Sequence, residues 1–194
     1  MEALNERLRL LRERAKEGRD PTCADETLDL LLQTAERFRP ANVLEIGAAE
    51  GLTSVALCLN AGARVTAIEL DTERAAAARR HFTAFGVKSQ AELLEGDAGE
   101  ILPLLQGEYD MIFLDGPKVQ YARYLPDCKR LLKRGGMLFS DDVLLFGWVR
   151  GEPPKKRRML VEHIRAYLQM LEADPELETE VLELGEGLAV SRKK

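Results

Sequence analysis

The stretch Val43-Leu44-Glu45-Ile46-Gly47-Ala48-Ala49-Glu50-Gly51-Leu52-Thr53 decides the fold. A short apolar run is followed by two glycines four positions apart, and a helical pattern begins at Leu52. Gly47 permits a sharp turn at the strand end, and Gly51 lets the backbone approach a ligand where the helix begins. The stretch differs from the G-x-G-x-x-G pattern, whose three glycines bring backbone N–H groups against a pyrophosphate. It therefore predicts a strand, a turn and a helix that bind a ligand without phosphates.

Further apolar runs alternate with helical patterns after this stretch. With the first strand at 43–46, we expect strands at 64–69, 92–95, 111–114 and 137–140, and helices at 52–60, 72–85, 99–105 and 123–132. Gly86 and Gly135 stand where helix ends are expected, and Asp71 is a natural N-cap. This alternation predicts a parallel sheet that helices cover on both faces.

The flanking segments complete the predicted architecture. Residues 1–11 form an amphipathic pattern, and leucines at helical spacing over 25–39 predict a helix that Pro40 ends. A loop over 141–154, a helix over 155–172 and strands at 179–184 and 188–191 follow the fifth strand. The short connection at Gly185-Glu186-Gly187 favours a hairpin. We expect an α/β fold with a mostly parallel seven-stranded sheet and a C-terminal antiparallel pair. It forms one domain over 1–194, in which helices of 1–40 cover the site and 42–194 form the core.

Composition sets the class of protein and its compartment. The chain has 194 residues, of which 45% are hydrophobic and 31% charged, and a net charge of -5 gives no bulk attraction to nucleic acid or anionic membranes. Cys23, Cys58 and Cys128 form no C-x-x-C pair, which argues against a disulfide framework and a zinc site. Neither a signal peptide nor a membrane-spanning stretch is visible, so we expect a cytoplasmic protein without a membrane partner.

Acidic residues at the ends of the second and third predicted strands favour a nucleoside ligand. Glu69 can accept hydrogen bonds from both hydroxyls of a ribose. Asp97 and Ala98 offer a carboxylate and a backbone amide where an adenine would lie, although Asp97 can also cap the next helix. Because the carboxyl ends of parallel strands share one edge, these residues and Gly47 should meet in one crevice. The adenosine of S-adenosylmethionine is the economical occupant.

Three aspartates follow the fourth and fifth predicted strands. Asp115, Asp141 and Asp142 should crowd at the same edge of the sheet, where their repulsion would call for a cation. Carboxylates are hard ligands that suit Mg²⁺, with Mn²⁺ or another divalent ion as an alternative, and such an ion would activate a substrate hydroxyl. Lys118 would then be the general base, with its pKa lowered by the cation. Acidic loop caps without a metal, and a solvated surface lysine, are the alternatives.

These motifs resemble the metal-dependent O-methyltransferases that include the catechol and caffeoyl-CoA enzymes. The matching stretches are Val-Leu-Glu-Ile-Gly at 43–47, Gly-Asp-Ala at 96–98, Phe-Leu-Asp at 113–115 with Lys118, and Ser-Asp-Asp-Val-Leu at 140–144. The resemblance covers about residues 20–192 and implies a Rossmann-like class I methyltransferase.

The resemblance also implies the roles of single residues. It places around the cofactor the backbone of Cys23 and the residues Glu45, Gly47, Thr53, Glu69, Asp97, Ala98 and Asp115. It makes Asp115, Asp141 and Asp142 the metal ligands and Lys118 the base. Asp142 departs from the asparagine frequent in the family. Gly116-Pro117 replaces bulkier groups of the catechol enzymes and puts a catechol substrate in doubt.

Within that family the chain is most similar to the bacterial tRNA 5-hydroxyuridine methyltransferases, which form 5-methoxyuridine at the wobble position. The supporting stretches lie at 115–121, 141–147, 155–158 and 185–192. The 5-hydroxyl and 4-carbonyl oxygens of 5-hydroxyuridine can chelate one metal ion as the two oxygens of a catechol do. The anticodon loop would contact Lys155, Lys156, Arg157 and Arg158, with Arg150 adding charge and Trp148 a stacking face, unless these residues only solvate the surface.

Other functions stay open at this point. A small catechol-like or acyl-CoA-linked phenol is the alternative acceptor. A non-catalytic RNA-binding module is an alternative from another class, and a nicotinamide oxidoreductase is disfavoured by the absent third glycine. The resemblance further suggests a homodimer that uses the N-terminal helix.

Overall fold

The computed structural model describes residues 2–17 and 22–194, so that Met1 of the predicted N-terminal helix lies outside the described residues. One mixed sheet has the strand order β3-β2-β1-β4-β5-β7-β6. Its strands are β1 (Asn42–Ile46), β2 (Arg64–Glu69), β3 (Ala91–Glu95), β4 (Tyr109–Leu114), β5 (Leu132–Ser140), β6 (Leu177–Leu182) and β7 (Leu188–Lys193). The first five strands are parallel, and β7 lies antiparallel between β5 and β6. The predicted α/β fold with a C-terminal antiparallel pair is confirmed.

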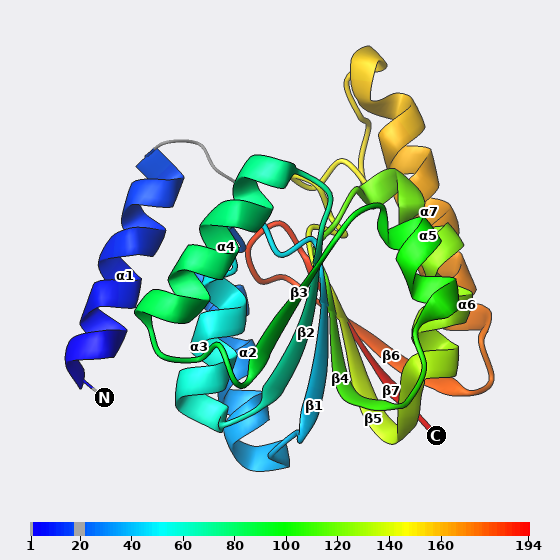
Figure 1. Cartoon of the computed structure of the whole chain (residues 1–194). Helices are drawn as coiled ribbons and strands as arrows, with labels where there is room; N and C mark the ends of the chain where they lie inside the picture. The colour runs from blue at the N-terminus through cyan, green and yellow to red at the C-terminus, as the bar shows by residue number, and fades with distance from the viewer. Residues whose placement is uncertain (1, 18–21) are drawn as a thin grey trace.

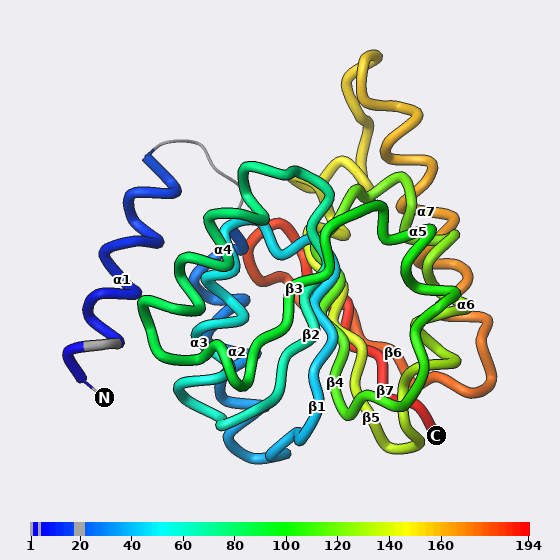
Figure 2. Tube along the Cα trace, in the orientation of Figure 1, coloured from blue at the N-terminus to red at the C-terminus, as the bar shows by residue number. Residues whose placement is uncertain are grey.

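Helices cover both faces of this sheet, as Figures 1 and 2 show. One face carries α1 (Glu2–Glu17), α2 (Asp25–Phe38), α3 (Leu52–Ala61) and α4 (Thr72–Ala84), and the other carries α5 (Ala98–Ile101), α6 (Tyr121–Leu131) and α7 (Arg158–Ala173). Val43 and Leu44 are both fully buried, in the core layers of opposite faces. Burial on both faces explains why the strands read as continuous apolar runs instead of alternating patterns.

Several element bounds differ from the predicted ones. The helix α1 continues to Glu17. Short 3-10 turns precede α6 and α7, at Lys118–Gln120 and Lys155–Arg157. A third 3-10 turn, Leu102–Leu104, follows α5. The prediction that Gly135 ends a helix is wrong. It lies inside β5 with a φ of +78°, where the pairing of β4 with β5 shifts register, and a left-handed backbone there favours glycine.

Other local predictions are confirmed. Asp71 caps α4 by accepting hydrogen bonds from the backbone N–H groups of Glu73 and Arg74. Gly86 follows the end of α4 with a φ of +71°. The pair β6 and β7 forms the expected antiparallel hairpin. Of the helices in 2–17 and 22–194, none is both long enough and apolar enough to cross a membrane.

Candidate cofactor and acceptor site

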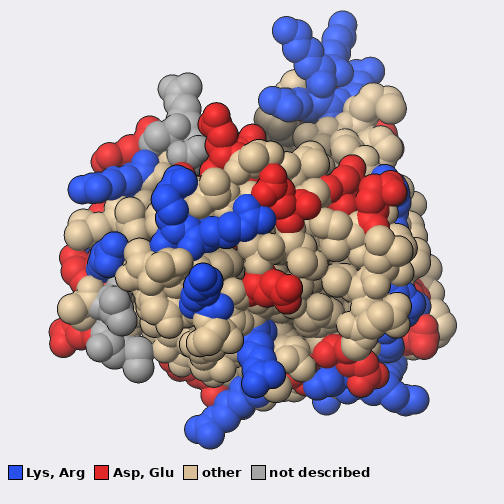
Figure 3. All heavy atoms as spheres, viewed as in Figure 1, with Lys and Arg blue, Asp and Glu red and all other residues tan. Residues whose placement is uncertain are grey.

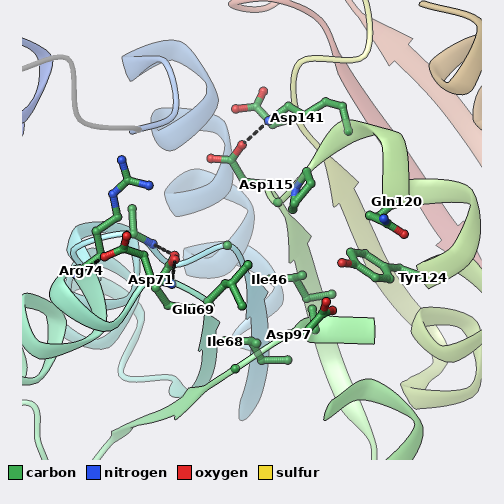
Figure 4. A pocket seen from close by; sticks show the side chains of 18 of the residues that line it. Ile46, Ile68, Glu69, Asp71, Arg74, Asp97, Asp115, Gln120, Tyr124 and Asp141 are labelled. Atoms are coloured by element: carbon green, nitrogen blue, oxygen red, sulfur yellow. Dashed lines mark hydrogen bonds and ion pairs between the residues drawn. The ribbon is translucent and has the colours of Figure 1, made fainter. Parts of the chain in front are cut away.

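A cavity of about 1040 Å³ opens at the carboxyl edge of the parallel strands. Figure 4 shows Ile46 and Ile68 on its floor, Glu69 on one side, Tyr124 on the other and Asp115 beside Asp141 at one end. The predicted residues that line it are Cys23, Gly47, Glu69, Asp97, Ala98, Asp115, Lys118, Asp141 and Asp142. The structure therefore brings these residues to one crevice, as the strand ends predicted.

The turn after β1 is held close to the end of β4. Gly47 has a φ of +89°, and a Cβ placed on it would lie 2.5 Å from the carbonyl oxygen of Asp115. Its N–H donates to the carbonyl of Ile68 at 2.9 Å. Any side chain at this position would push the ends of β1 and β4 apart, and this close approach leaves the cavity floor open to a ligand.

The two acidic residues predicted for a nucleoside have defined local roles. Glu69 is 8% exposed, and its two carboxylate oxygens accept hydrogen bonds from the backbone N–H groups of Ala49 at 2.7 Å and Asp71 at 2.8 Å. Each oxygen keeps a further lone pair for a ligand hydroxyl. Asp97 accepts from the N–H of Gly99 at 2.6 Å and so caps α5, while it also lines the cavity. Capping and ligand contact are thus compatible.

A smaller cavity adjoins the large one and shares Cys23, Gly47 and Asp115 with it. The predicted residues Glu45 and Thr53 line this smaller cavity. Glu45 is 2% exposed and accepts a hydrogen bond from the Ser54 hydroxyl. Burial raises the pKa of Glu45 to about 8, against the opposing effect of that hydrogen bond, so the group is mainly neutral at pH 7.

Lys118 lies between two of the three aspartates. Its Nζ is 2.8 Å from Asp115 Oδ1 and 3.0 Å from Asp142 Oδ2. Asp141 is 1% exposed, and its Oδ1 accepts from the Thr27 hydroxyl at 3.3 Å. The predicted clustering of Asp115, Lys118, Asp141 and Asp142 at one strand edge is therefore present, with an ammonium group placed between two of the carboxylates.

The electrostatics of this cluster follow from burial and mutual repulsion. Burial raises the pKa of Asp141, and the neighbouring charges of Asp115 and Asp142 raise it further. Burial also raises the pKa of Asp115, although Lys118 opposes this effect. For Lys118 burial lowers the pKa, but Tyr121, Asp115 and Asp142 outweigh it and hold the pKa well above its usual range. The protein by itself therefore keeps Lys118 charged, and the predicted lowering would need another positive charge near the aspartates.

A divalent cation is compatible with this donor set. Carboxylate oxygens from the ends of β4 and β5 line the cavity and attract the Lys118 ammonium, which shows that the position favours positive charge. Within the described part of the chain, no three His, Cys, Asp or Glu side chains already stand in the geometry of a metal site. The Lys118 ammonium lies between Asp115 and Asp142 in this structure.

The residues predicted to contact RNA lie outside the cavity. Figure 3 shows blue side chains crowded on the part that projects above α7, where Lys155, Lys156, Arg157 and Arg158 are all exposed. Arg150 forms an ion pair with Glu183 on the hairpin side. The rings of Phe146 and Trp148 are 5.0 Å apart, and Phe146 is 67% exposed.

Sequence reasoning missed residues that shape the site. Tyr121 is fully buried, and its hydroxyl is 2.9 Å from the carbonyl of Leu114 and 3.1 Å from that of Asp141, which joins the ends of β4 and β5. Tyr124 and Gln120 line the large cavity. The aromatic residues three and six positions after Lys118 were the available signal: Tyr121 is buried against the strand ends, and Tyr124, one helical turn later, lines the cavity.

The sheet order with its inserted antiparallel strand, together with a nucleoside-sized cavity at the parallel strand ends, defines the Rossmann-like methyltransferase class. The O-methyltransferase family model matches residues 16–194. The chain belongs to this family, and the prediction of an S-adenosylmethionine-dependent O-methyltransferase is confirmed. The alternatives of an oxidoreductase and a non-catalytic module are thereby set aside.

Named relatives agree with this assignment. Tapetum-specific methyltransferase 1 of Arabidopsis thaliana is 31% identical over 178 residues, which cover 87% of this chain and 76% of the relative. The catechol O-methyltransferase of Niastella koreensis is 30% identical, over 77% of this chain and 70% of that protein. Caffeoyl-CoA O-methyltransferase 1 of Eucalyptus globulus is also 30% identical, over 89% of this chain and 74% of that protein.

Solved structures share the fold. A candidate caffeoyl-CoA O-methyltransferase of Staphylococcus aureus superposes with a TM-score of 0.90 at 30% identity, over 96% of this chain and 92% of that one. The Podospora anserina methyltransferase PaMTH1, solved with S-adenosylhomocysteine bound, superposes with a TM-score of 0.86 at 25% identity, over 100% of this chain and 88% of that one.

Proposed function

We propose that the protein transfers the methyl group of S-adenosylmethionine, with the help of Mg²⁺, to the 5-hydroxyl of 5-hydroxyuridine at the tRNA wobble position. Adenine would lie at Asp97 and Ala98, and the ribose hydroxyls at Glu69. The amino-acid tail would lie where the large cavity meets the smaller one, beside Cys23 and Asp115, with Glu45 and Thr53 behind them. This placement points the sulfonium methyl toward Asp115, beyond which the acceptor would bind.

The aspartates and Lys118 would prepare the acceptor. Asp115, Asp141 and Asp142 would hold the divalent ion, which when bound supplies Lewis acidity to the acceptor oxygens. Neutralisation of Asp115 and Asp142 would lower the pKa of Lys118, because their charges, together with Tyr121, raise it. Its Nζ would then take the proton of the acceptor hydroxyl, while the cavity walls align oxygen, methyl carbon and sulfur for an in-line displacement.

The observation that carries the choice of RNA is the exposed basic surface at the start of α7. Lys155, Lys156, Arg157 and Arg158 are consecutive and exposed, and Figure 3 shows basic side chains gathered on the projecting part of the molecule. Such a group attracts phosphates from a large anionic partner, whereas catechol carries no phosphate for it to attract. The exposed Phe146 ring, packed on Trp148, offers a face on which an unstacked base can lie.

A small phenol is the second candidate acceptor, because named relatives are catechol and caffeoyl-CoA O-methyltransferases. The test is a methyl-transfer assay with Mg²⁺ that offers tRNA containing 5-hydroxyuridine, catechol and caffeoyl-CoA separately. We expect 5-methoxyuridine in the tRNA, detected by mass spectrometry of its nucleosides. Methylation of the small phenols alone would reject the tRNA proposal.

A charge reversal separates the basic surface from the catalytic site. Lys156→Glu should raise KM for tRNA and reduce the dependence of this KM on salt, with no change in KM for catechol. Lys88→Glu, at another exposed lysine, is the matched control and should leave KM for tRNA unchanged. An equal response of the two variants would remove the basic surface from the proposal.

The expected homodimer and cytoplasmic location stay predictions. Sedimentation at micromolar concentration measures the oligomeric state, and the expected result is twice the mass of the 21.7 kDa chain. Fractionation of cells measures the location.

A further inference from the structure

A buried arginine of α1 lies beside the smaller cavity. Arg12 is 4% exposed although it belongs to a helix that packs on the outside of α3. Its Nη2 donates to the carbonyl oxygen of Cys23 at 2.9 Å. Cys23 lines the smaller cavity, as does Ala15, which follows Arg12 by about one turn of the same helix. Arg12 itself does not line the cavity, but it contacts Cys23, which does.

The positive charge of Arg12 is only partly compensated. Asp25 accepts from Arg12 Nη2 at 3.3 Å, but its other oxygen is 2.6 Å from Nζ of Lys16. One carboxylate, which is 66% exposed, therefore serves two cations. Among the residues the structure describes, Nη1 of Arg12 is buried and has no hydrogen-bond partner. A buried guanidinium with an unused donor is costly unless something else supplies negative charge.

The lining of the smaller cavity contains acids, hydroxyls and small apolar residues but, within the described part of the chain, no lysine or arginine. Asp115 borders the space where the cofactor tail is proposed to lie, and Glu45 and Thr53 lie behind it. The Asp115 carboxylate suits the ammonium of an amino acid but repels its carboxylate, and Glu45, which is mainly neutral at pH 7, offers that carboxylate no positive charge. A cation on the side of Cys23 and Thr53 would balance the carboxylate of a tail that carries both charges.

We propose that Arg12 is the positioning residue for the carboxylate of the cofactor's amino-acid tail, supplying positive charge from behind Cys23 and fixing the Cys23 backbone at the wall of the cavity. This proposal rests on the proposed placement of the tail where the two cavities meet beside Cys23. It gives α1 a direct role in binding the cofactor, in addition to covering the site. It also explains why Arg12 is buried while its helix neighbour Lys16 is not.

The test compares two ligands that differ only in the carboxylate. Binding of S-adenosylmethionine and of decarboxylated S-adenosylmethionine is measured by isothermal titration calorimetry for the wild type, Arg12→Met and Lys16→Met. Arg12→Met should weaken S-adenosylmethionine by about tenfold or more, which is about 1.4 kcal/mol. The decarboxylated ligand should change by less than about twofold, because it has no group for Arg12 to attract. Lys16→Met removes a cation from the same Asp25 and should leave both affinities within about twofold.

Equal weakening of both ligands by Arg12→Met would overturn the proposal, since it would mean that Arg12 only holds α1 in place. An unchanged affinity for S-adenosylmethionine would overturn it as well. If Arg12→Met does not fold, Arg12→Lys takes its place, because it keeps the positive charge. This variant should keep the wild-type preference for S-adenosylmethionine over the decarboxylated ligand, and loss of that preference would overturn the proposal. A wild type that binds neither ligand would instead refute the proposed cofactor placement.

Discussion

Replacing Glu45 by Gln tests the burial of a carboxyl group beside the smaller cavity. Glu45 is 2% exposed, and burial raises its pKa from 4.5 to about 8. The gap, at about 1.36 kcal/mol per pKa unit, amounts to about 5 kcal/mol. The folded state holds the proton of Glu45 more tightly than the unfolded chain does. The contribution of this protonated group to the free energy of unfolding is therefore complete below pH 4.5 and is lost as the pH rises through 8.

Glu45→Gln keeps the shape of the neutral side chain and removes its titration. The free energy of unfolding, measured with urea from pH 5 to pH 9, should fall with pH more steeply in the wild type than in the variant. Between pH 5.5 and 7.5 the free energies of unfolding of the two proteins should diverge by about 2–3 kcal/mol in favour of the variant. Ser54→Ala is the control, because it removes a hydrogen bond that lowers the pKa of Glu45. In this variant the fall of the free energy of unfolding with pH should extend to higher pH than in the wild type. Parallel curves for wild type and Glu45→Gln would refute the reasoning.

Three further perturbations address the site and its frame. Gly47→Ala places a Cβ against the carbonyl of Asp115, at a residue with a left-handed backbone, and should lower the free energy of unfolding by about 2–4 kcal/mol. Thermal melting would measure this loss, and an unchanged Tm would contradict it. Lys118→Ala should reduce kcat about 10²–10⁴-fold while calorimetry finds S-adenosylmethionine bound as before; a defect in binding alone would exclude the base role. Tyr167→Phe removes a 2.6 Å hydrogen bond to the buried Ser140 and should cost about 1–3 kcal/mol in urea unfolding, whereas a neutral result would mean that water replaces the hydroxyl.

The sequence predicted the parts of the molecule that depend on local pattern. The strand and glycine turn at 43–51 are recognisable because burial on both faces demands an apolar run and the approach to Asp115 demands glycine at 47. The meeting of Glu69, Asp115 and Asp141 also follows, since parallel strand ends share one edge.

What the sequence could not predict depends on contacts between distant segments. The ion pairs of Lys118 with Asp115 and Asp142 require the side-chain geometry of two strand ends, so its raised pKa was not foreseen. Gly135 was placed at a helix end because a glycine after a helical pattern usually ends it, but the register shift between β4 and β5 uses it instead. The burial of Arg12 is set by packing against Cys23, which no periodicity reports.

The strand order has a consequence for assembly of the chain during translation. The strand β6 leaves the ribosome before β7, yet its neighbour in the sheet is β7, which lies between it and β5. Until β7 is inserted, β6 has no partner edge and β5 remains an open edge of the parallel sheet. Closure of this side of the protein must therefore wait for synthesis of residues 188–193, and a nascent chain stalled before them would expose the β5 edge to other chains.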